Sequence, residues 1–271
     1  MKRFVIQLMC LGMLLTCFSN CRYDKHGLLG NDYRLFEDTP AWELAKAVKK
    51  EDVSKIDLIV SSNPKIIDYQ EPMYGQTLLM LTIMNQQYKS FKALLAKGAD
   101  VNIHDTYNGT SPLIEACNSK YYDLIYAKML IESGANVNDV EIGERREGNS
   151  TRLTPLIAAS VAGNINLVQF LVTKNAEVNY QNEFGQSALS KSVLVGNYAI
   201  VYYLLLNGAD YHRPIFYRPD YSVLSEKKDP NDKGSPIYLT DELKEITKND
   251  FENYKYKILI EDFLAKTNRE K

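Results

Sequence analysis

The segment Gly98-Ala99-Asp100-Val101-Asn102 returns along the chain with small changes, and this repetition indicates the fold. Its later copies are Gly134-Ala135-Asn136-Val137-Asn138, Asn175-Ala176-Glu177-Val178-Asn179 and Gly208-Ala209-Asp210-Tyr211. A second signature precedes each copy: Gly75-Gln76-Thr77-Leu78-Leu79, Gly109-Thr110-Ser111-Pro112-Leu113, Arg152-Leu153-Thr154-Pro155-Leu156 and Gly185-Gln186-Ser187-Ala188-Leu189. The Thr or Ser of this signature recurs after 34, 43 and 33 residues. Such a period predicts an array of similar units.

Each unit reads as a turn followed by two helices. The Thr or Ser can cap a first helix, and a Pro directly after it is tolerated at the first helical position. A Gly after the second helix suits the left-handed residue that ends a helix, and Asn175 is the substitute most able to take that conformation. The apolar second helices around 167–172 and 200–205 require neighbours, because one helix pair cannot make a core.

These signatures resemble the ankyrin-repeat family, and the resemblance covers roughly residues 70–211. It implies an all-α fold: an ankyrin-repeat solenoid with a degenerate N-terminal starter repeat and a divergent C-terminal helical cap. The starter begins near Thr39-Pro40, so we expect the repeats to occupy 37–211. The family's usual His after Thr-Pro-Leu is replaced in this chain by Met80, Ile114, Ile157 and Ser190.

The first residues predict export from the cytoplasm. Lys2 and Arg3 precede an apolar run over 4–18, and polar residues follow that run. The run is shorter than the about 20 apolar residues that a spanning helix needs. We therefore expect a signal peptide over 1–21 rather than a permanent transmembrane anchor.

The cysteines near the end of this leader suggest a lipid anchor. Cys21 stands where the chain turns polar and is the expected lipobox cysteine, with Cys17 as the alternative. Residues 22–36 would then form a tether. Arg22 directly after Cys21 implies, by resemblance to enterobacterial sorting, the periplasmic face of the outer membrane. A plain cleaved signal and a soluble periplasmic protein is the alternative.

The repeat pattern stops after Tyr211. Prolines interrupt the next stretch, which predicts an irregular loop: Pro214, Pro219, Pro230 and Pro236. Apolar residues at helical spacing return between Phe251 and Phe263. We expect 212–271 to contain this proline-containing loop and a C-terminal helical cap, with the cap over 235–266.

The composition excludes some functions. The formal net charge is −2, and about −4 without Lys2 and Arg3, so no basic field for nucleic acid is expected. The histidines, His26, His104 and His212, lie far apart, and His104-Asp105 is expected on a solvated turn. We therefore expect no enzyme, no catalytic residue, no metal and no cofactor.

The mature part of the chain would keep one cysteine, Cys117. It stands in Ile114-Glu115-Ala116-Cys117, where the family places small residues between helices. We expect a buried structural thiol, without an internal disulfide.

The resemblance also implies where a partner would bind. In this family the concave face is built by the finger-like loops and the outer part of each first helix. The register places these partner-binding residues there: Met73, Tyr74, Gln76, Met84, Asn85, Tyr107, Asn108, Asn118, Val161, Glu183, Phe184 and Leu194. The extended loop 140–152 adds Arg145 and Arg146. Much of this stripe is apolar or aromatic, which favours protein binding over the alternative that the aromatics pack on the adjacent turn.

The complete layout is similar to ankyrin-repeat lipoproteins that act as immunity proteins against type VI secretion phospholipase effectors. It implies a monomeric, lipid-anchored periplasmic protein that occludes a secreted antibacterial toxin. The alternative is a periplasmic ankyrin adaptor that stabilises another protein, such as a catalase.

Overall fold

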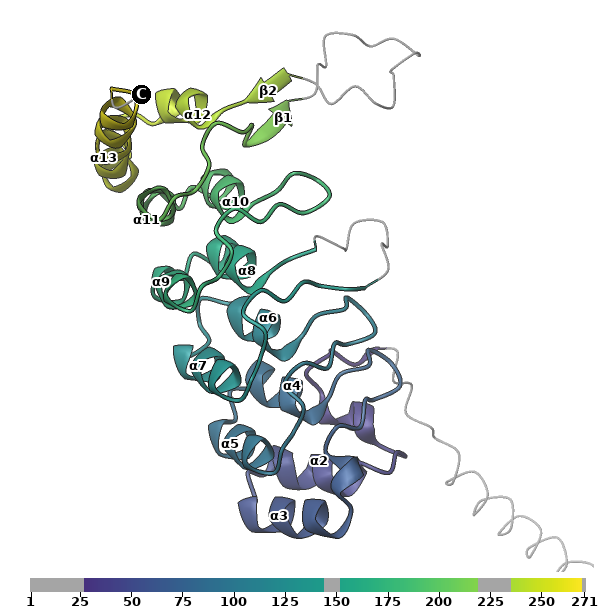
Figure 1. Ribbon diagram of the computed structural model, residues 1–271. Helices are drawn as coiled ribbons and strands as arrows, with labels where there is room; N and C mark the ends of the chain where they lie inside the picture. The colour runs from purple at the N-terminus through teal and green to yellow at the C-terminus, as the bar shows by residue number, and fades with distance from the viewer. Residues whose placement is uncertain (1–26, 144–151, 219–234, 270–271) are drawn as a thin grey trace, which may run out of the picture.

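A computed structural model describes residues 27–143, 152–218 and 235–269. Paired helices stack one above the next, and loops project from one side of the stack (Figure 1). The first helices form the row nearer these loops: α2 (Trp42–Lys49), α4 (Leu78–Met84), α6 (Pro112–Cys117), α8 (Pro155–Ala162) and α10 (Ala188–Leu194). The second helices form the other row: α3 (Val53–Ser62), α5 (Tyr88–Ala96), α7 (Leu124–Glu132), α9 (Ile165–Thr173) and α11 (Tyr198–Leu206). The expected ladder of helix pairs is confirmed.

The helices begin and end where the signatures predict. Each capping side chain accepts a hydrogen bond from the backbone N–H three residues later, at Thr77, Ser111, Thr154 and Ser187. Gly98, Gly134 and Gly208 follow second helices with φ of 82°, 95° and 83°, and Asn175 has φ of 63°. These left-handed residues end the helices and turn the chain toward the next loop.

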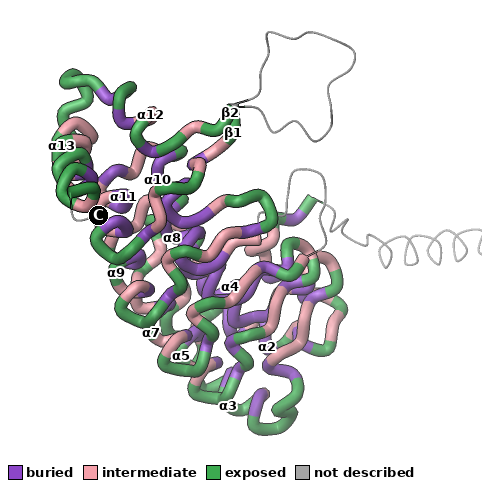
Figure 2. The backbone as a smooth tube through the Cα atoms, turned by 45° about the horizontal axis from the view of Figure 1, so that its top comes forward, coloured by how far each residue is buried: buried purple, intermediate pink, exposed green. Residues whose placement is uncertain are grey.

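The core runs without interruption between the two rows of helices (Figure 2). Phe91 of α5 and Tyr126 of α7 meet edge to face with ring centroids 4.9 Å apart, so adjacent repeats share one core contact. Cys117 is fully buried and is not in a disulfide, as expected. Burial raises the pKa of its thiol, which keeps the sulfur protonated and unreactive.

The predicted starter repeat is confirmed as α2, α3 and the short 3-10 helix η3 (Pro64–Ile66). Asp68, which follows η3, accepts a hydrogen bond from the Asp100 backbone N–H at 2.9 Å. Asp68 thereby joins the starter to the first full repeat. It occupies the register position that asparagine occupies in the later repeats.

Asparagine side chains join each full repeat to the next. The Asn138 Nδ2 donates to the Asn175 carbonyl at 3.3 Å, and its Oδ1 accepts from the Glu177 N–H at 2.8 Å. Asn102 and Asn179 form equivalent pairs of bonds with the repeats that follow them. The last residue of the end signature is therefore an inter-repeat clamp, which explains why the motif ends in Asn.

The loops between repeats, which we call the fingers, comprise residues 71–76, 105–110, 141–153 and 182–186, the third being described at 141–143 and 152–153. A buried polar side chain at the first residue holds each finger: Glu71, Asp105, Glu141 and Asn182. The Asp105 Oδ1 accepts from the backbone N–H groups of Tyr107, Asn108 and Gly109 at 2.7–3.0 Å. A Cβ on Gly109 would lie 1.8 Å from the Gly143 nitrogen, so glycine lets neighbouring fingers touch.

The N-terminal residues correct the expected tether over 22–36. Residues 33–36 form the 3-10 helix η2 (Tyr33–Phe36), in which Leu35 and Phe36 are fully buried beside α2. Leu28 is also buried. These apolar side chains gain more by packing on the starter than by staying in water. Residues 28–36 therefore belong to the folded domain, and 22–26 lie outside the described residues.

The C-terminal part contains two short strands that the all-α expectation did not include. Strands β1 (Phe216–Arg218) and β2 (Ser235–Ile237) pair antiparallel, with Phe216 opposite Ile237. The expected helical cap follows as α12 (Leu239–Glu245) and α13 (Phe251–Thr267). α13 packs on α11, where Ile260 and Leu264 are buried. The cap covers the apolar end of the array and leaves the fold mostly helical.

Replacing Asn138 by alanine should lower the free energy of unfolding by about 1 kcal/mol, because two inter-repeat hydrogen bonds are lost and water only partly replaces them at their exposed backbone partners. Urea unfolding monitored by circular dichroism measures the change. Asn166→Ala is the control, since Asn166 is exposed on α9 and should change stability by less than about 0.5 kcal/mol. Equal effects of both substitutions would contradict the clamp.

Candidate protein-binding face

The fingers and the first helices together form one continuous surface, which we call the inner face (Figure 1). The partner-binding residues expected from the sequence lie on it, apart from Arg145 and Arg146, which fall outside the described residues. The structure divides this surface into two halves with different properties. The half at α4 is covered by the chain itself, whereas no described segment covers the half at α8 and α10, which we call the open half.

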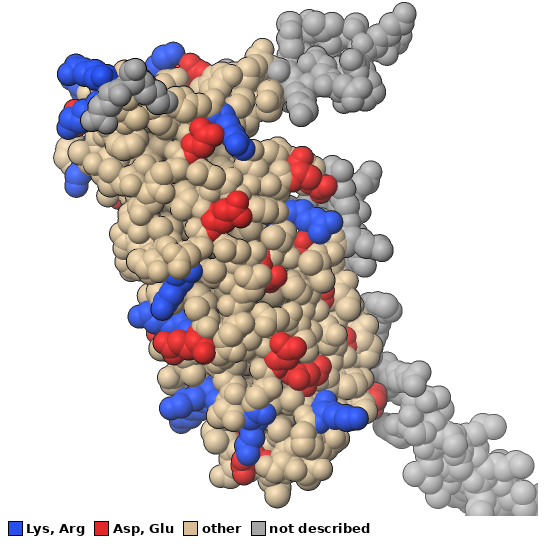
Figure 3. All heavy atoms as spheres, viewed as in Figure 1, with Lys and Arg blue, Asp and Glu red and all other residues tan. Residues whose placement is uncertain are grey.

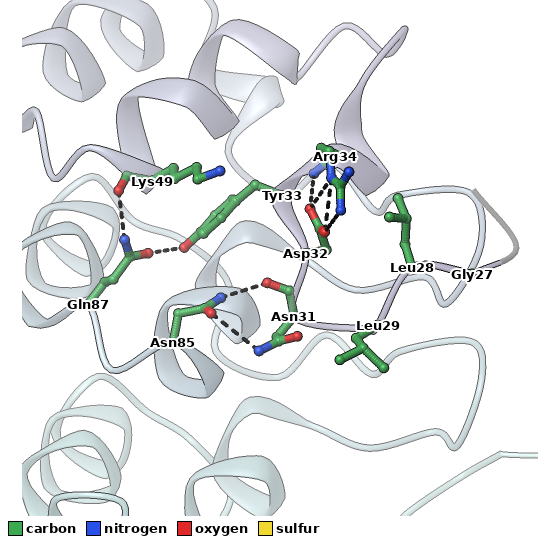
Figure 4. A pocket seen from close by; sticks show the side chains of 10 residues that line it. All are labelled: Gly27, Leu28, Leu29, Asn31, Asp32, Tyr33, Arg34, Lys49, Asn85 and Gln87. Atoms are coloured by element: carbon green, nitrogen blue, oxygen red, sulfur yellow. Dashed lines mark hydrogen bonds and ion pairs between the residues drawn. The ribbon is translucent and has the colours of Figure 1, made fainter. Parts of the chain in front are cut away.

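The N-terminal segment 28–36 covers the inner face of the first full repeat. The Tyr74 hydroxyl donates to the Leu28 carbonyl at 2.9 Å, and the Asn85 Nδ2 donates to the Asn31 carbonyl at 2.9 Å. Figure 4 shows Asn85 facing Asn31 and Gln87 bonded to the Tyr33 hydroxyl. Tyr74 and Asn85, which the sequence places among the partner-binding residues, therefore hold the chain's own N-terminal segment.

A cavity of about 650 Å³ lies between this segment and the loop after α4 (Figure 4). Arg34 and Asp32 form a two-point ion pair on its wall, and Lys49 contributes a further charge. The hydrogen bond from Arg34 lowers the pKa of the Asp32 carboxyl. The cavity walls come mostly from segment 28–36, so the cavity belongs to the covered half.

The aromatic finger tips pack on one another. The Tyr74 and Tyr107 rings meet edge to face with centroids 5.3 Å apart, and both side chains are half-buried. Tyr74 and Tyr107 therefore pack on the adjacent turn, which is the alternative to partner binding that the sequence left open for the finger-tip aromatics. Met73, Gln76 and Met84 are likewise half-buried, whereas Asn108 and Asn118 are exposed.

The other half of the inner face exposes apolar side chains. Val161 ends α8 with 39% of its surface exposed, and Leu194 and Val195 at the end of α10 are each 47% exposed. Phe184 on the last finger is 42% exposed, and its neighbour Glu183 is exposed too. Apolar side chains at adjacent helix ends are typical of a surface that another protein covers.

Two charged residues occupy the same register position on the first helices. Glu115 and Lys191 each stand four residues after a capping serine, where α4 has Leu81 and α8 has Ala158. Burial raises the pKa of Glu115, which accepts a hydrogen bond from the Tyr122 hydroxyl at 3.3 Å. Burial lowers the pKa of Lys191. The sequence prediction of the binding face did not include this position.

The sequence predicted His104 on a solvated turn, but the structure buries most of its side chain. Its Nε2 lies 3.0 Å from the Asp139 Oδ2 of the next repeat, and both side chains are largely buried. The Asp139 hydrogen bond raises the pKa of His104. Burial alone would raise the pKa of Asp139, but hydrogen bonds from His104 and Ser111 lower it. The pair is a structural bridge between repeats.

Three further properties concern metal binding, membrane-spanning helices and surface charge. Within residues 27–143, 152–218 and 235–269, no cluster of three or more His, Cys, Asp or Glu could hold a metal ion. None of the helices in these ranges is long and apolar enough to cross a membrane. Acidic and basic side chains are interspersed on the face seen in Figure 3, unlike the continuous basic surface that nucleic acid requires. Cys17 and Cys21 lie outside the described residues.

Segment 28–36 is the part of the inner face that sequence reasoning missed. A signal was present, because Leu28, Tyr33, Leu35 and Phe36 are unusually apolar for a free tether. Lys191 could have been found by aligning the first helices, where it replaces an apolar residue.

Asn85→Ala should loosen segment 28–33 without unfolding the array, because it removes the side chain that holds Asn31. We expect amide hydrogen exchange in 28–33 to become roughly tenfold faster, the change that a loss of about 1.4 kcal/mol gives. Asn118→Ala is the control, since Asn118 is an exposed residue at the end of α6. Unchanged protection of 28–33 in Asn85→Ala would contradict the covering contact.

The His104–Asp139 pair predicts a pH-dependent stability. Because the folded state raises the pKa of His104 above its usual 6.5, the pair's contribution is full below pH 6.5 and is lost as the pH rises through the folded value. Asp139→Asn should remove about 1 kcal/mol at pH 6 and less at pH 9. Thermal unfolding across this range measures it. An equal loss at both pH values would show that the charge of His104 contributes nothing.

The comparisons with known proteins agree with this architecture. A family model described as ankyrin repeats, in three copies, matches residues 44–141 and 139–214. The chain is 26% identical over 204 residues to the ankyrin repeat and KH domain-containing protein mask-1 of Caenorhabditis elegans, which covers 64% of this chain and 7% of that protein. It is 28% identical over 163 residues to the B-cell lymphoma 3 protein homolog of Mus musculus, covering 59% of this chain and 33% of that protein.

A third relative is an ankyrin repeat protein of Acanthamoeba polyphaga mimivirus, 36% identical over 87 residues, or 32% of this chain and 52% of the relative. The chain thus spans about half or less of the length of these relatives, and the likeness concerns the repeats. The family match over both halves of the array, together with the helix pairs, fingers and asparagine clamps, leads to one conclusion. The chain belongs to the ankyrin-repeat family.

Proposed function

We propose that this protein binds another protein through the open half of its inner face. Ankyrin repeats typically bind other proteins, and the family membership of this chain is established. The observation that carries the proposal is the exposure of Val161, Leu194 and Val195 at the ends of neighbouring first helices. Covering neighbouring aliphatic side chains by a partner removes apolar area from water, which favours association.

The finer proposal is an immunity protein that occludes a secreted antibacterial effector in the periplasm. It rests on the leader-like residues 1–21 and on the inner face as a binding surface. Occlusion needs no catalytic group in this chain, so we propose that it acts as a non-enzymatic, monomeric binder. The partner would lose access to its own substrate when its active-site opening faces α8 and α10.

The proposed location is the periplasmic face of the outer membrane, with the chain anchored by lipid on Cys21. Cys21→Ser should abolish incorporation of labelled palmitate and release the protein into the soluble periplasmic fraction. Cys17→Ser is the matched control and should leave both labelling and membrane association unchanged. Loss of labelling in Cys17→Ser alone would assign the anchor to Cys17, and a wild-type protein that takes up no label would reject lipidation.

Leu194→Asp combined with Val161→Asp should weaken partner binding by roughly 100-fold or more, because two charges enter a surface that the partner must dehydrate. The measurement is recovery of the crosslinked partner from native cells, together with survival of a deletion strain in competition with its siblings. Leu206→Asp is the control, since Leu206 is 55% exposed on α11 in the opposite row.

The results of these experiments distinguish an immunity role from an adaptor role. A deletion strain that siblings kill, rescued by wild type and Leu206→Asp but not by the double variant, supports immunity through the inner face. Recovery of a resident enzyme such as a catalase, with no change in competition, would replace immunity by an adaptor role. Equal binding by all variants would place the partner elsewhere on the molecule.

A further inference from the structure

Lys191 is a positive charge on the open half for which the described part of the chain provides no carboxylate partner. It is half-buried on α10, and burial is the one cause that shifts its pKa. No ion pair or hydrogen bond to its Nζ occurs among the described residues. The other half-buried lysines among the described residues, Lys46 and Lys257, have carboxylates beside them.

Lys191 lies on the same side of α10 as the exposed apolar residues of the open half. Lys191, Leu194 and Val195 are spaced by three and four residues on α10, so their side chains lie on one side of the helix. Leu194 and Val195 are exposed, and α8, which ends near Val161, packs directly against α10. A molecule on this apolar surface therefore meets the ammonium group of Lys191 at its edge.

The first full repeat shows how a peptide can occupy this track. Segment 28–33 crosses the inner face there, and Asn85 binds its backbone at Asn31. Asn85 stands eight residues after its cap, as Val195 does after Ser187. Leu81, the register equivalent of Lys191, is fully buried in that repeat. The same track that holds the chain's own segment at α4 is open at α8 and α10.

We propose that the open half of the inner face binds an extended segment of the partner in which an Asp or Glu is flanked by apolar residues. The carboxylate pairs with the Lys191 ammonium, and the apolar side chains cover Val161, Leu194 and Val195. This proposal rests on the proposed function and adds the chemistry of the partner. An aspartate or glutamate fits because a partly buried ammonium group gains most from an opposite charge brought to it in the dehydrated interface.

The carboxylate of the partner segment would distinguish it from other hydrophobic segments. The apolar side chains would accept many hydrophobic segments, since aliphatic contacts have little directional preference. A segment that places a neutral or basic residue over Lys191 would leave the ammonium group dehydrated and unpaired, which costs affinity. Glu115 cannot supply the counter-charge, because it is two repeats away on α6 and is bonded to Tyr122.

The test uses the full chain and a phage-displayed library of random peptides of about 12 residues, which extend to about 40 Å. We expect the enriched peptides to contain Asp or Glu between Leu, Ile, Val or Phe. A synthetic copy of the most enriched peptide should bind wild type at least tenfold more tightly than it binds Lys191→Met, which keeps the length of the side chain but not its charge. Lys92→Gln is the matched control on the opposite row and should bind like wild type.

A charge exchange completes the experiment. Lys191→Glu should lose the acidic peptide and bind a version in which the acidic residue is replaced by Lys, restoring at least part of the affinity. Unfolding curves verify that each variant is folded before its affinity is compared. Peptides without an acidic residue, or equal binding by wild type and Lys191→Met, would overturn the proposal while leaving partner binding at the inner face intact. Equal binding by Leu194→Asp would instead contradict the proposed binding face itself.

Discussion

The structure depends on apolar contact between successive helix pairs. Each pair has apolar side chains on surfaces that face its neighbours, and none of these surfaces could be buried by a pair alone. Contacts such as Phe91 against Tyr126 therefore stabilise two repeats at once. The asparagine clamps make this stacking more specific, because their hydrogen bonds fix the register of one repeat against the next.

A stack of this kind has two ends that must be covered. At one end the starter repeat and residues 28–36 bury Leu35 and Phe36, and at the other α13 covers α11. The N-terminal cover extends further than the end itself, because segment 28–33 also lies across the inner face of the first full repeat. The covering of the stack thereby decides which part of the inner face remains open.

The open part combines an apolar surface with the half-buried ammonium group of Lys191, for which the described residues provide no ion-pair partner. Covering aliphatic side chains favours association without selecting a partner, whereas a charge selects among partners. The polar residues deeper in the fingers have a different role. Asp105 holds the backbone of its own turn, and the His104–Asp139 pair joins two repeats, so these groups stabilise the array and leave partner contact to the surface side chains.

The helix pairs, their caps at Thr77 and Ser111 and the left-handed residues that end the helices could be predicted from the sequence, because they depend on residue types at fixed spacing along the chain. The folding of the expected tether over Tyr74 and Asn85 could not be predicted in this way. That contact joins residues far apart in sequence, and no local preference encodes it. For the same reason the short strands after the last repeat and the unpaired state of Lys191 became visible only when distant segments were placed together.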